Sequence, residues 1–283
     1  MNYMIKQAKE VKFKPNFILV LLIGLTMFIV GSIPMSFMSL GVDKDISLPI
    51  NDLILGFGFV TLTCFLYVKL IEKRSIRSLG FQKQNALKFY LKGLINGLVV
   101  FSFIVILGVM TGALTFEFTF KSIQWHVFLL LFLGFVIQGG TEEIVFRGWM
   151  FPILSAKYNV AVSIAITSFG FALLHGLNPG ISIMGVVNLI LFGIFSALYT
   201  LKEDSLWGIC GFHSIWNWIQ GSFYGIKVSG MTIPGGSLFT TDSVPNKSLL
   251  SGGAFGLEAS ILTSIVLTSA SIYSYKKIKE KAC

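Results

Sequence analysis

Residues 158–201 read YNVAVSIAITSFGFALLHGLNPGISIMGVVNLILFGIFSALYTL and contain no Asp, Glu, Lys or Arg. A helix needs about 20 apolar residues to cross the hydrocarbon core of a bilayer, so this run is long enough for two crossings. Asn178, Pro179 and Gly180 form a turn signal near its middle. The stretch therefore predicts two membrane-spanning helices that are joined by a short turn.

Six further uncharged stretches occur along the chain, and most are long enough to cross a membrane once. Together with the two helices above, they predict an all-α, polytopic transmembrane helical bundle with about eight spans. The composition agrees, because 54% of the 283 residues are hydrophobic, 12% are charged and the mean hydropathy is +0.79. The six stretches are Phe17–Met38, Leu53–Val68, Gly93–Phe116, Ser122–Thr141, Ser205–Ile226 and Ala259–Tyr275.

The net charge of +9 predicts the orientation of the spans. Lys and Arg near span ends are retained on the cytoplasmic side, and this places most basic residues inside when both termini are cytoplasmic. Only Lys44, Lys121, Lys227 and Lys247 then lie outside. We therefore expect contacts with membrane lipid and its anionic headgroups, and no nucleic-acid partner.

The domain organisation is simple, because no polar segment is long enough to bury a core of its own. We expect a basic cytoplasmic segment over residues 1–14, a single transmembrane domain over residues 15–275 and a cytoplasmic tail over residues 276–283. The first apolar run lacks a small-residue cleavage site, which predicts a retained span and no signal peptide. Three scattered cysteines offer neither a disulfide framework nor a zinc ribbon.

Ionisable residues inside a span are costly, so they are functional candidates by default. Residues 139–147 read GGTEEIVFR. Glu143 and Arg147 are four residues apart with the acid first, which favours an ion pair on a helix. Glu142 is rotated about 100° away and has no partner within its helix, which would suit a general base. The alternative is that these charges only mark the wetted inner end of a span.

Two imidazoles lie in the later apolar runs. His175 follows Phe171 by four residues, and no other ionisable side chain is near it in the sequence. His213 and Asn217 have the same spacing and therefore share a helix face. A lone intramembrane His can also be a simple hydrogen-bonding residue between helices.

The depths of these groups predict that they converge. A helical hairpin that turns at Lys157 lifts Glu142 and His175 to a similar depth, roughly 22–27 Å along the helices at about 1.5 Å per residue. His213 is nearer its own inner turn, at a height of about 14 Å. Tilt, or an inward-dipping turn at residues 178–180, must therefore bring His213 level.

As a set, these groups resemble the CPBP family of intramembrane proteases, also called the Abi family, which includes the CAAX prenyl endopeptidases. The pattern there is Glu-Glu-x-x-x-Arg, then Phe-x-x-x-His, then His-x-x-x-Asn. The resemblance covers residues from about 122 to 222. Every defined position is present and in order, as Glu142, Glu143, Arg147, Phe171, His175, His213 and Asn217.

The resemblance implies an intramembrane endopeptidase of a bacterial cell membrane. Its substrate would be a membrane-associated peptide or protein, such as a bacteriocin or signal-peptide precursor or a CAAX-like protein, cut near the cytoplasmic half of the bilayer. Glu142 with His175 would activate a water, and His213 and Asn217 would donate hydrogen bonds to the oxyanion. The implied catalytic residues are thus Glu142, His175, His213 and Asn217, supported by Glu143, Arg147 and Phe171.

We expect no cofactor, because the Asn of His-x-x-x-Asn is a poor metal ligand and the chain has no His-Glu-x-x-His. The alternative is a catalytic zinc held by Glu142, His175 and His213. Two other functions fit the same residues: a proton-coupled transporter, for which no inverted repeat is found, and a non-catalytic immunity or scaffold protein of the membrane. The sequence leaves the oligomeric state open.

Overall fold

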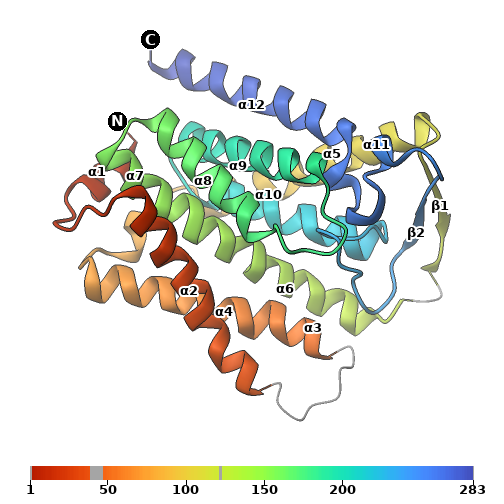
Figure 1. Cartoon of the computed structure of the whole chain (residues 1–283), viewed down its shortest axis with the longest axis horizontal. Coiled ribbons are helices and arrows are strands. Elements are labelled where there is room, and N and C mark those ends of the chain that lie inside the picture. Colours follow the sequence, from red (N-terminus) through yellow and green to blue (C-terminus); the bar gives the residue numbers. More distant parts are fainter. Residues whose placement is uncertain (1, 39–46, 121–122, 283) are drawn as a thin grey trace.

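The computed structural model of the chain describes residues 2–38, 47–120 and 123–282. Lys44 and Lys121, which we expect on the outer side, lie outside these residues. The described part is a helical bundle with one small two-stranded sheet, and both termini lie at the end of the bundle opposite that sheet (Figure 1). The predicted all-α class is confirmed.

Five helices of the described residues are long and apolar enough to cross a membrane. The expected number of about eight spans is not confirmed, because α8 (Val160–Leu174) is shorter, and α10 (Trp207–Trp218) and α12 (Ile261–Ala282) do not satisfy both conditions. Three of the five are single helices: α2 (Phe17–Met38), α5 (Ala86–Met110) and α9 (Ile183–Glu203). The span Pro49–Ile71 is made of α3 (Ser47–Asn51), η1 (Asp52–Gly56), α4 (Phe57–Leu66) and η2 (Tyr67–Ile71). The span Trp125–Lys157 is made of α6 (Trp125–Glu143), η5 (Ile144–Met150) and α7 (Phe151–Lys157).

The predicted turn within residues 158–201 is present. Helix α8 ends at Leu174 and α9 begins at Ile183. Each helix starts at a polar cap, because the side chain of Asn159 accepts a hydrogen bond from the backbone of α8 and Ser182 does the same for α9. The cap at Asn159 places the hairpin turn directly after α7, where the sequence predicts it.

Helix α10 lies inside the bundle, packed against α5 and α6. Glycines allow this close approach: a Cβ on Gly93 of α5 would lie 1.9 Å from the carbonyl oxygen of Gly208, and a Cβ on Gly139 of α6 would lie 3.0 Å from the backbone nitrogen of Ser214. Residues 208–217 are therefore buried throughout. A polar residue on α10 consequently faces protein rather than lipid.

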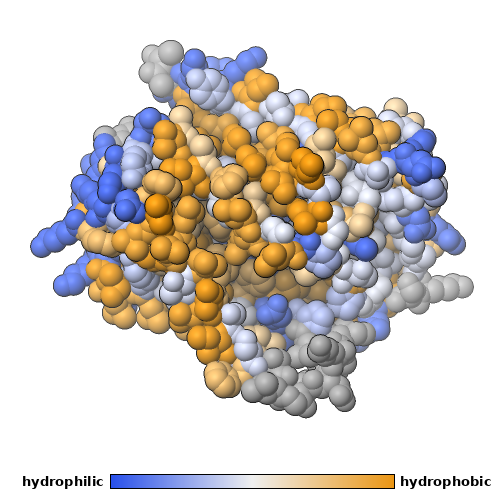
Figure 2. Space-filling view, viewed as in Figure 1, coloured by the Kyte–Doolittle hydropathy of each residue, from blue (hydrophilic) through white to orange (hydrophobic). Residues whose placement is uncertain are grey.

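The middle of the molecule is apolar on its outer surface. Figure 2 shows hydrophobic residues across the centre of one face and hydrophilic residues toward its two ends. Large apolar side chains such as Leu129, Ile95 and Phe169 are more than half exposed. Lipid tails are the solvent that such a surface requires, and the chain is an integral membrane protein.

The end of the bundle opposite the termini carries more structure than the sequence predicts. The strands β1 (Leu114–Phe118) and β2 (Phe239–Ser243) pair antiparallel, so the expected helical span to Phe116 is wrong at its end. Helix α5 stops at Met110 because Gly112 adopts a left-handed conformation (φ 64°) that a helix cannot continue. Three short helical turns complete this end: α11 (Ser248–Ser251), η7 (Gly253–Phe255) and η8 (Leu257–Ala259).

The basic N-terminal segment forms α1 (Tyr3–Lys9), which packs against α7. The backbone N–H of Tyr3 donates to both oxygens of Asp204, at 2.9 and 3.1 Å, just after the end of α9. This contact joins the start of the chain to the turn between α9 and α10.

Candidate active site

Glu142 lies near the end of α6 and is 3% exposed. The amide nitrogen Nε2 of Gln138 donates to its Oε1 at 2.6 Å, and the Nδ2 of Asn217 donates to the Oε1 of Gln138 at 2.8 Å. The prediction that Glu142 has no partner within its own helix is wrong, because Gln138 stands one turn earlier and donates to it. The second carboxylate oxygen, Oε2, has no hydrogen-bond partner among the described residues.

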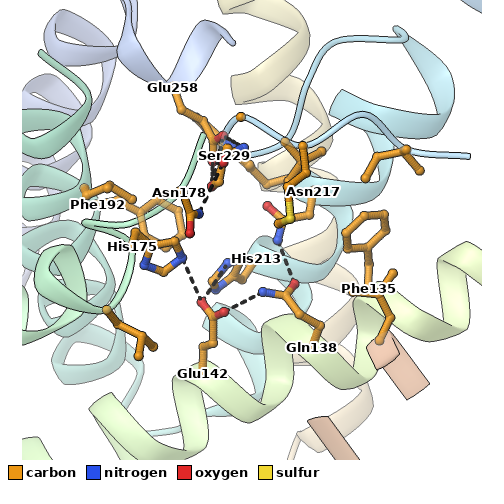
Figure 3. Close-up of a pocket in the computed structure, with 18 of the residues that line it drawn as sticks. Phe135, Gln138, Glu142, His175, Asn178, Phe192, His213, Asn217, Ser229 and Glu258 are labelled. Carbon is orange, nitrogen blue, oxygen red and sulfur yellow. Dashed lines mark hydrogen bonds and ion pairs between the residues drawn. The ribbon is translucent and has the colours of Figure 1, made fainter. Parts of the chain in front are cut away.

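His175 caps the C-terminus of α8 and directs Nε2 toward Glu142. Its Nδ1 lies 3.0 Å from the carbonyl oxygen of Phe171, and a carbonyl can only accept, so Nδ1 carries the hydrogen. The Nε2 atom lies 3.9 Å from the Oε2 of Glu142. In Figure 3 a ring nitrogen of His175 points toward Glu142. In a neutral ring whose Nδ1 carries the hydrogen, this nitrogen is unprotonated.

His213 reaches the same oxygen from α10. Its Nε2 lies 3.8 Å from the Oε2 of Glu142, while its Nδ1 lies 2.8 Å from the Oε1 of Glu143. Distances of 3.8 and 3.9 Å are too long for direct hydrogen bonds, and a small group between the three side chains would bring each within reach. The predicted convergence of the two imidazoles on Glu142 is what Figure 3 shows.

Glu143 and Arg147 form the ion pair that their spacing predicts. The Nε of Arg147 lies 3.4 Å from the Oε2 of Glu143, and both side chains are at most 1% exposed. The guanidinium also lies against the ring of Phe171, 4.6 Å from its centroid. The ring of Phe171 in turn contacts that of His175, with centroids 4.7 Å apart. Phe171 therefore separates the buried cation from the imidazole.

These side chains line one cavity of about 600 Å³. Residues 228–234, from the loop at the end of the bundle opposite the termini, also line it. The cavity is therefore bounded on one side by the end of the bundle that carries β1 and β2. Cleavage near the cytoplasmic half of the bilayer stays a prediction. The lining residues used below are Asp52, Gln138, Glu142, Phe171, His175, Asn178, His213, Asn217, Ser229 and Glu258.

Glu258 is a lining residue that the sequence analysis missed. Its carboxylate accepts from the backbone and hydroxyl of Ser229 and, at 3.0 Å, from the Nε2 of Gln220. Burial raises the pKa of this carboxyl, and the hydrogen bond from the Ser229 backbone opposes that shift. An acid at the start of the last apolar run was the available signal, since Glu258 stands between Leu257 and Ala259.

The loop held by Glu258 is tied to His175. The Nδ2 of Asn178 donates to the carbonyl oxygen of Ser229 at 3.2 Å, and the backbone N–H of Asn178 donates to the carbonyl oxygen of His175 at 3.0 Å. In Figure 3, Glu258, Ser229 and Asn178 form the wall of the cavity that lies across from Glu142. The turn at residues 178–180 therefore connects the imidazole to the loop of residues 228–234.

A catalytic zinc would have to be bound by three side chains that surround one point. Within the residues that the structure describes, no group of three or more His, Cys, Asp and Glu side chains stands where it could share one metal ion. The absence of a cofactor stays a prediction, and the mechanism proposed below uses the side chains of the chain alone.

One comparison with known proteins identifies the region that holds these groups. Residues 124–219 match the family described as "Rce1-like: Type II CAAX prenyl endopeptidase Rce1-like". The matched region contains all seven residues of the three sequence patterns, whereas Asp52, Ser229 and Glu258 lie outside it. No curated protein and no solved structure matches the chain.

Proposed function

Residues 124–219 belong to the Rce1-like CAAX protease family, which is the CPBP family, and on this premise we propose that the chain cleaves a peptide bond with a water activated by Glu142 and His175. One observation carries the proposal: a buried carboxylate oxygen of Glu142 lies 3.9 and 3.8 Å from the Nε2 atoms of His175 and His213. A water between these atoms would meet one carboxylate and two nitrogens. The family at this level consists of intramembrane endopeptidases.

Glu142 and His175 act as the base. Hydrogen bonding of Nδ1 to the Phe171 carbonyl leaves the Nε2 of His175 free to accept a proton. A water in contact with that nitrogen and the Glu142 carboxylate loses a proton as its oxygen attacks the carbonyl carbon. The same proton then passes to the leaving amine as the C–N bond breaks.

His213 and Asn217 stabilise the oxyanion. When both ring nitrogens of His213 carry hydrogens, Nδ1 donates to the Glu143 carboxylate, which lies 2.8 Å away, and Nε2 can donate to the oxyanion. Asn217 uses one N–H for Gln138 and retains a second for the substrate. Preplaced donors of this kind are effective where water is excluded.

The substrate we propose is a membrane-associated peptide or protein, of the bacteriocin-precursor, signal-peptide-precursor or CAAX-like class. The cavity is buried within an integral membrane protein, so a substrate must reach it from the lipid or from the membrane surface. We propose multi-pass insertion in a bacterial cell membrane with both termini cytoplasmic.

Glu142→Gln tests the reaction because it keeps the side-chain shape and removes the base. We expect membranes that carry the variant to accumulate an uncleaved precursor, and the purified variant to cleave that precursor roughly 10²–10⁴-fold more slowly. Comparative peptidomics of cells with either protein identifies the peptide. Glu117→Gln, at an exposed position of β1, is the matched control and keeps the wild-type rate.

The same assay separates the alternatives. An unchanged peptide pattern in cells with Glu142→Gln would contradict the protease and leave a transporter or a scaffold. The metal-free mechanism predicts that a zinc chelator leaves the rate of the purified protein unchanged. Loss of activity that added zinc restores would instead support the ligand set Glu142, His175 and His213.

A further inference from the structure

The cavity has an uneven charge. Three carboxyl groups line it, those of Asp52, Glu142 and Glu258, and no Lys or Arg is among its described lining residues. The nearest buried cation, Arg147, is paired with Glu143 and lies against Phe171, not in the lining. A low-dielectric cavity lined by one sign of charge attracts ligands of the other sign.

Asp52 stands at the rim of this cavity. It begins the π-helical turn η1 at the outer end of the second span, and its side chain is exposed. Its Oδ1 lies so close to the backbone of Gly56 that a Cβ there would be 2.5 Å away, so the glycine leaves room for the carboxylate. An acid within an apolar helix is costly unless it has a partner or a function.

One of these three carboxyl groups also shows where a ligand can bind. The Oε2 of Glu142 is buried and has no hydrogen-bond partner among the described residues. Buried polar atoms are normally paired, so this oxygen awaits a group that enters the cavity. The rim acid and this oxygen thus belong to the same binding space.

Building on the proposed function, we propose that the cavity selects a peptide with a basic side chain close to the scissile bond, and that Asp52 pairs with it. Asp52 is then a specificity-determining residue outside the family-matched region. Its charge discriminates between substrates, as charged residues near a binding site do by favouring one sign and opposing the other. Glu258 adds a further carboxyl group from the wall that lies across from Glu142 (Figure 3).

The spacing of the helices gives the position of that basic residue. Leu53, the neighbour of Asp52, packs against Gly134 of α6. Gly134 precedes Glu142 by eight residues, which is roughly 12 Å along the helix. An extended peptide covers about 3.3 Å per residue, so the basic side chain stands about four residues from the cleaved bond.

The proposal also disfavours one kind of substrate. A C-a-a-X protein carries its terminal carboxylate three residues after the cysteine. That negative charge would enter a cavity whose lining has carboxyl groups and no described Lys or Arg. We therefore expect an internal bond of a basic peptide to be cut faster than a bond next to a free C-terminus.

Synthetic peptides test the selection. They are built on a cleaved sequence found by the peptidomics above and carry Lys, Gln or Glu at each position within five residues of the bond, with the C-terminus free or amidated. The wild type should cleave the best Lys peptide with a kcat/KM about tenfold above that of its Gln partner. Asp52→Asn should remove this preference, and Asp52→Lys should reverse it in favour of Glu.

The control is Asp242→Asn, an exposed acid of β2 that does not line this cavity and should keep the wild-type preference. Equal cleavage of Lys, Gln and Glu peptides by the wild type overturns the selection and leaves the proposed protease intact. A preference that survives Asp52→Asn overturns the role of Asp52. Absence of any cleavage contradicts the proposed function, and the selection falls with it.

Discussion

Glu143 has two partners and so links the fold to the site. One carboxylate oxygen faces the guanidinium of Arg147 and the other faces the imidazole of His213. Arg147 is fully buried, and its three nitrogens have no hydrogen-bond partner among the described residues. The Glu143 carboxylate, 3.4 Å away, is therefore the main group that balances the buried positive charge. Removal of one member of such a pair leaves an uncompensated buried charge.

The double replacement of this pair separates stability from activity. Glu143→Ala should destabilise the protein by about 3–5 kcal/mol, and Glu143→Ala with Arg147→Met should regain most of this, because an apolar side chain replaces the orphaned cation. Activity should remain roughly 10²-fold low in the double variant, since His213 has lost its acceptor. Denaturant titration and peptide cleavage in detergent measure the two effects.

Glu280→Ala breaks the exposed Lys277–Glu280 pair and serves as the control. It should change neither quantity measurably, because surface ion pairs contribute little. Recovery of activity together with stability in the double variant would contradict a role for Glu143 in positioning His213.

At the level of single residues, the sequence predicts what helical spacing controls. Glu143 with Arg147, and His213 with Asn217, are four residues apart, so a helix alone places them together. The partner of Glu142 has that spacing too, and Gln138 was available to the same reasoning. Helical spacing could not predict the partner of Glu258. Its hydrogen bond with the loop residue Ser229 depends on how a non-periodic segment folds back over the bundle.

At the scale of helices, close glycine contacts set the position of α10. Gly93 of α5 faces the backbone of Gly208, and Gly139 of α6 faces that of Ser214. His213 lies between these two contacts along α10, which fixes its depth relative to Glu142. The sequence predicted the helices from their apolar runs, yet it left His213 lower than Glu142, because runs of hydrophobic residues carry no information on tilt.

Gly93→Ala should test this packing. The added methyl would lie 1.9 Å from a backbone oxygen that cannot move aside alone, and such overpacking costs about 1–3 kcal/mol. Gly58→Ala in α4 is the matched control, because a Cβ there meets nothing within 4 Å, and alanine favours a helix by about 1 kcal/mol relative to glycine. In a denaturant titration, the free energy of unfolding should fall for Gly93→Ala and rise for Gly58→Ala. A Gly93→Ala variant as stable as the wild type would contradict the close packing of Gly93 against Gly208.

The whole molecule is polarised along its long axis. Both termini and α1 lie at one end, and β1, β2 and α11 lie at the other (Figure 1). The loop at that second end lines the cavity, so the orientation of the bundle decides from which side of the membrane the cavity is covered. The apolar runs of the sequence predicted the membrane class correctly. They predicted about eight spans, whereas five helices of the described residues are long and apolar enough to cross a membrane. The numbers differ because a helix that is buried inside the bundle, such as α10, need not be long or uniformly apolar.

The distribution of Lys and Arg predicts that the end with β1 and β2 is extracytoplasmic. Single cysteines at Asp242 of β2 and at Lys83, in the segment between η2 and α5, test this, because both positions are exposed. The native Cys64 and Cys210 are buried and should not react, and Cys283 is replaced by Ser. A membrane-impermeant maleimide should label Asp242→Cys on intact cells and Lys83→Cys only after lysis. The reverse pattern would place the outer loop, and with it the covered side of the cavity, in the cytoplasm.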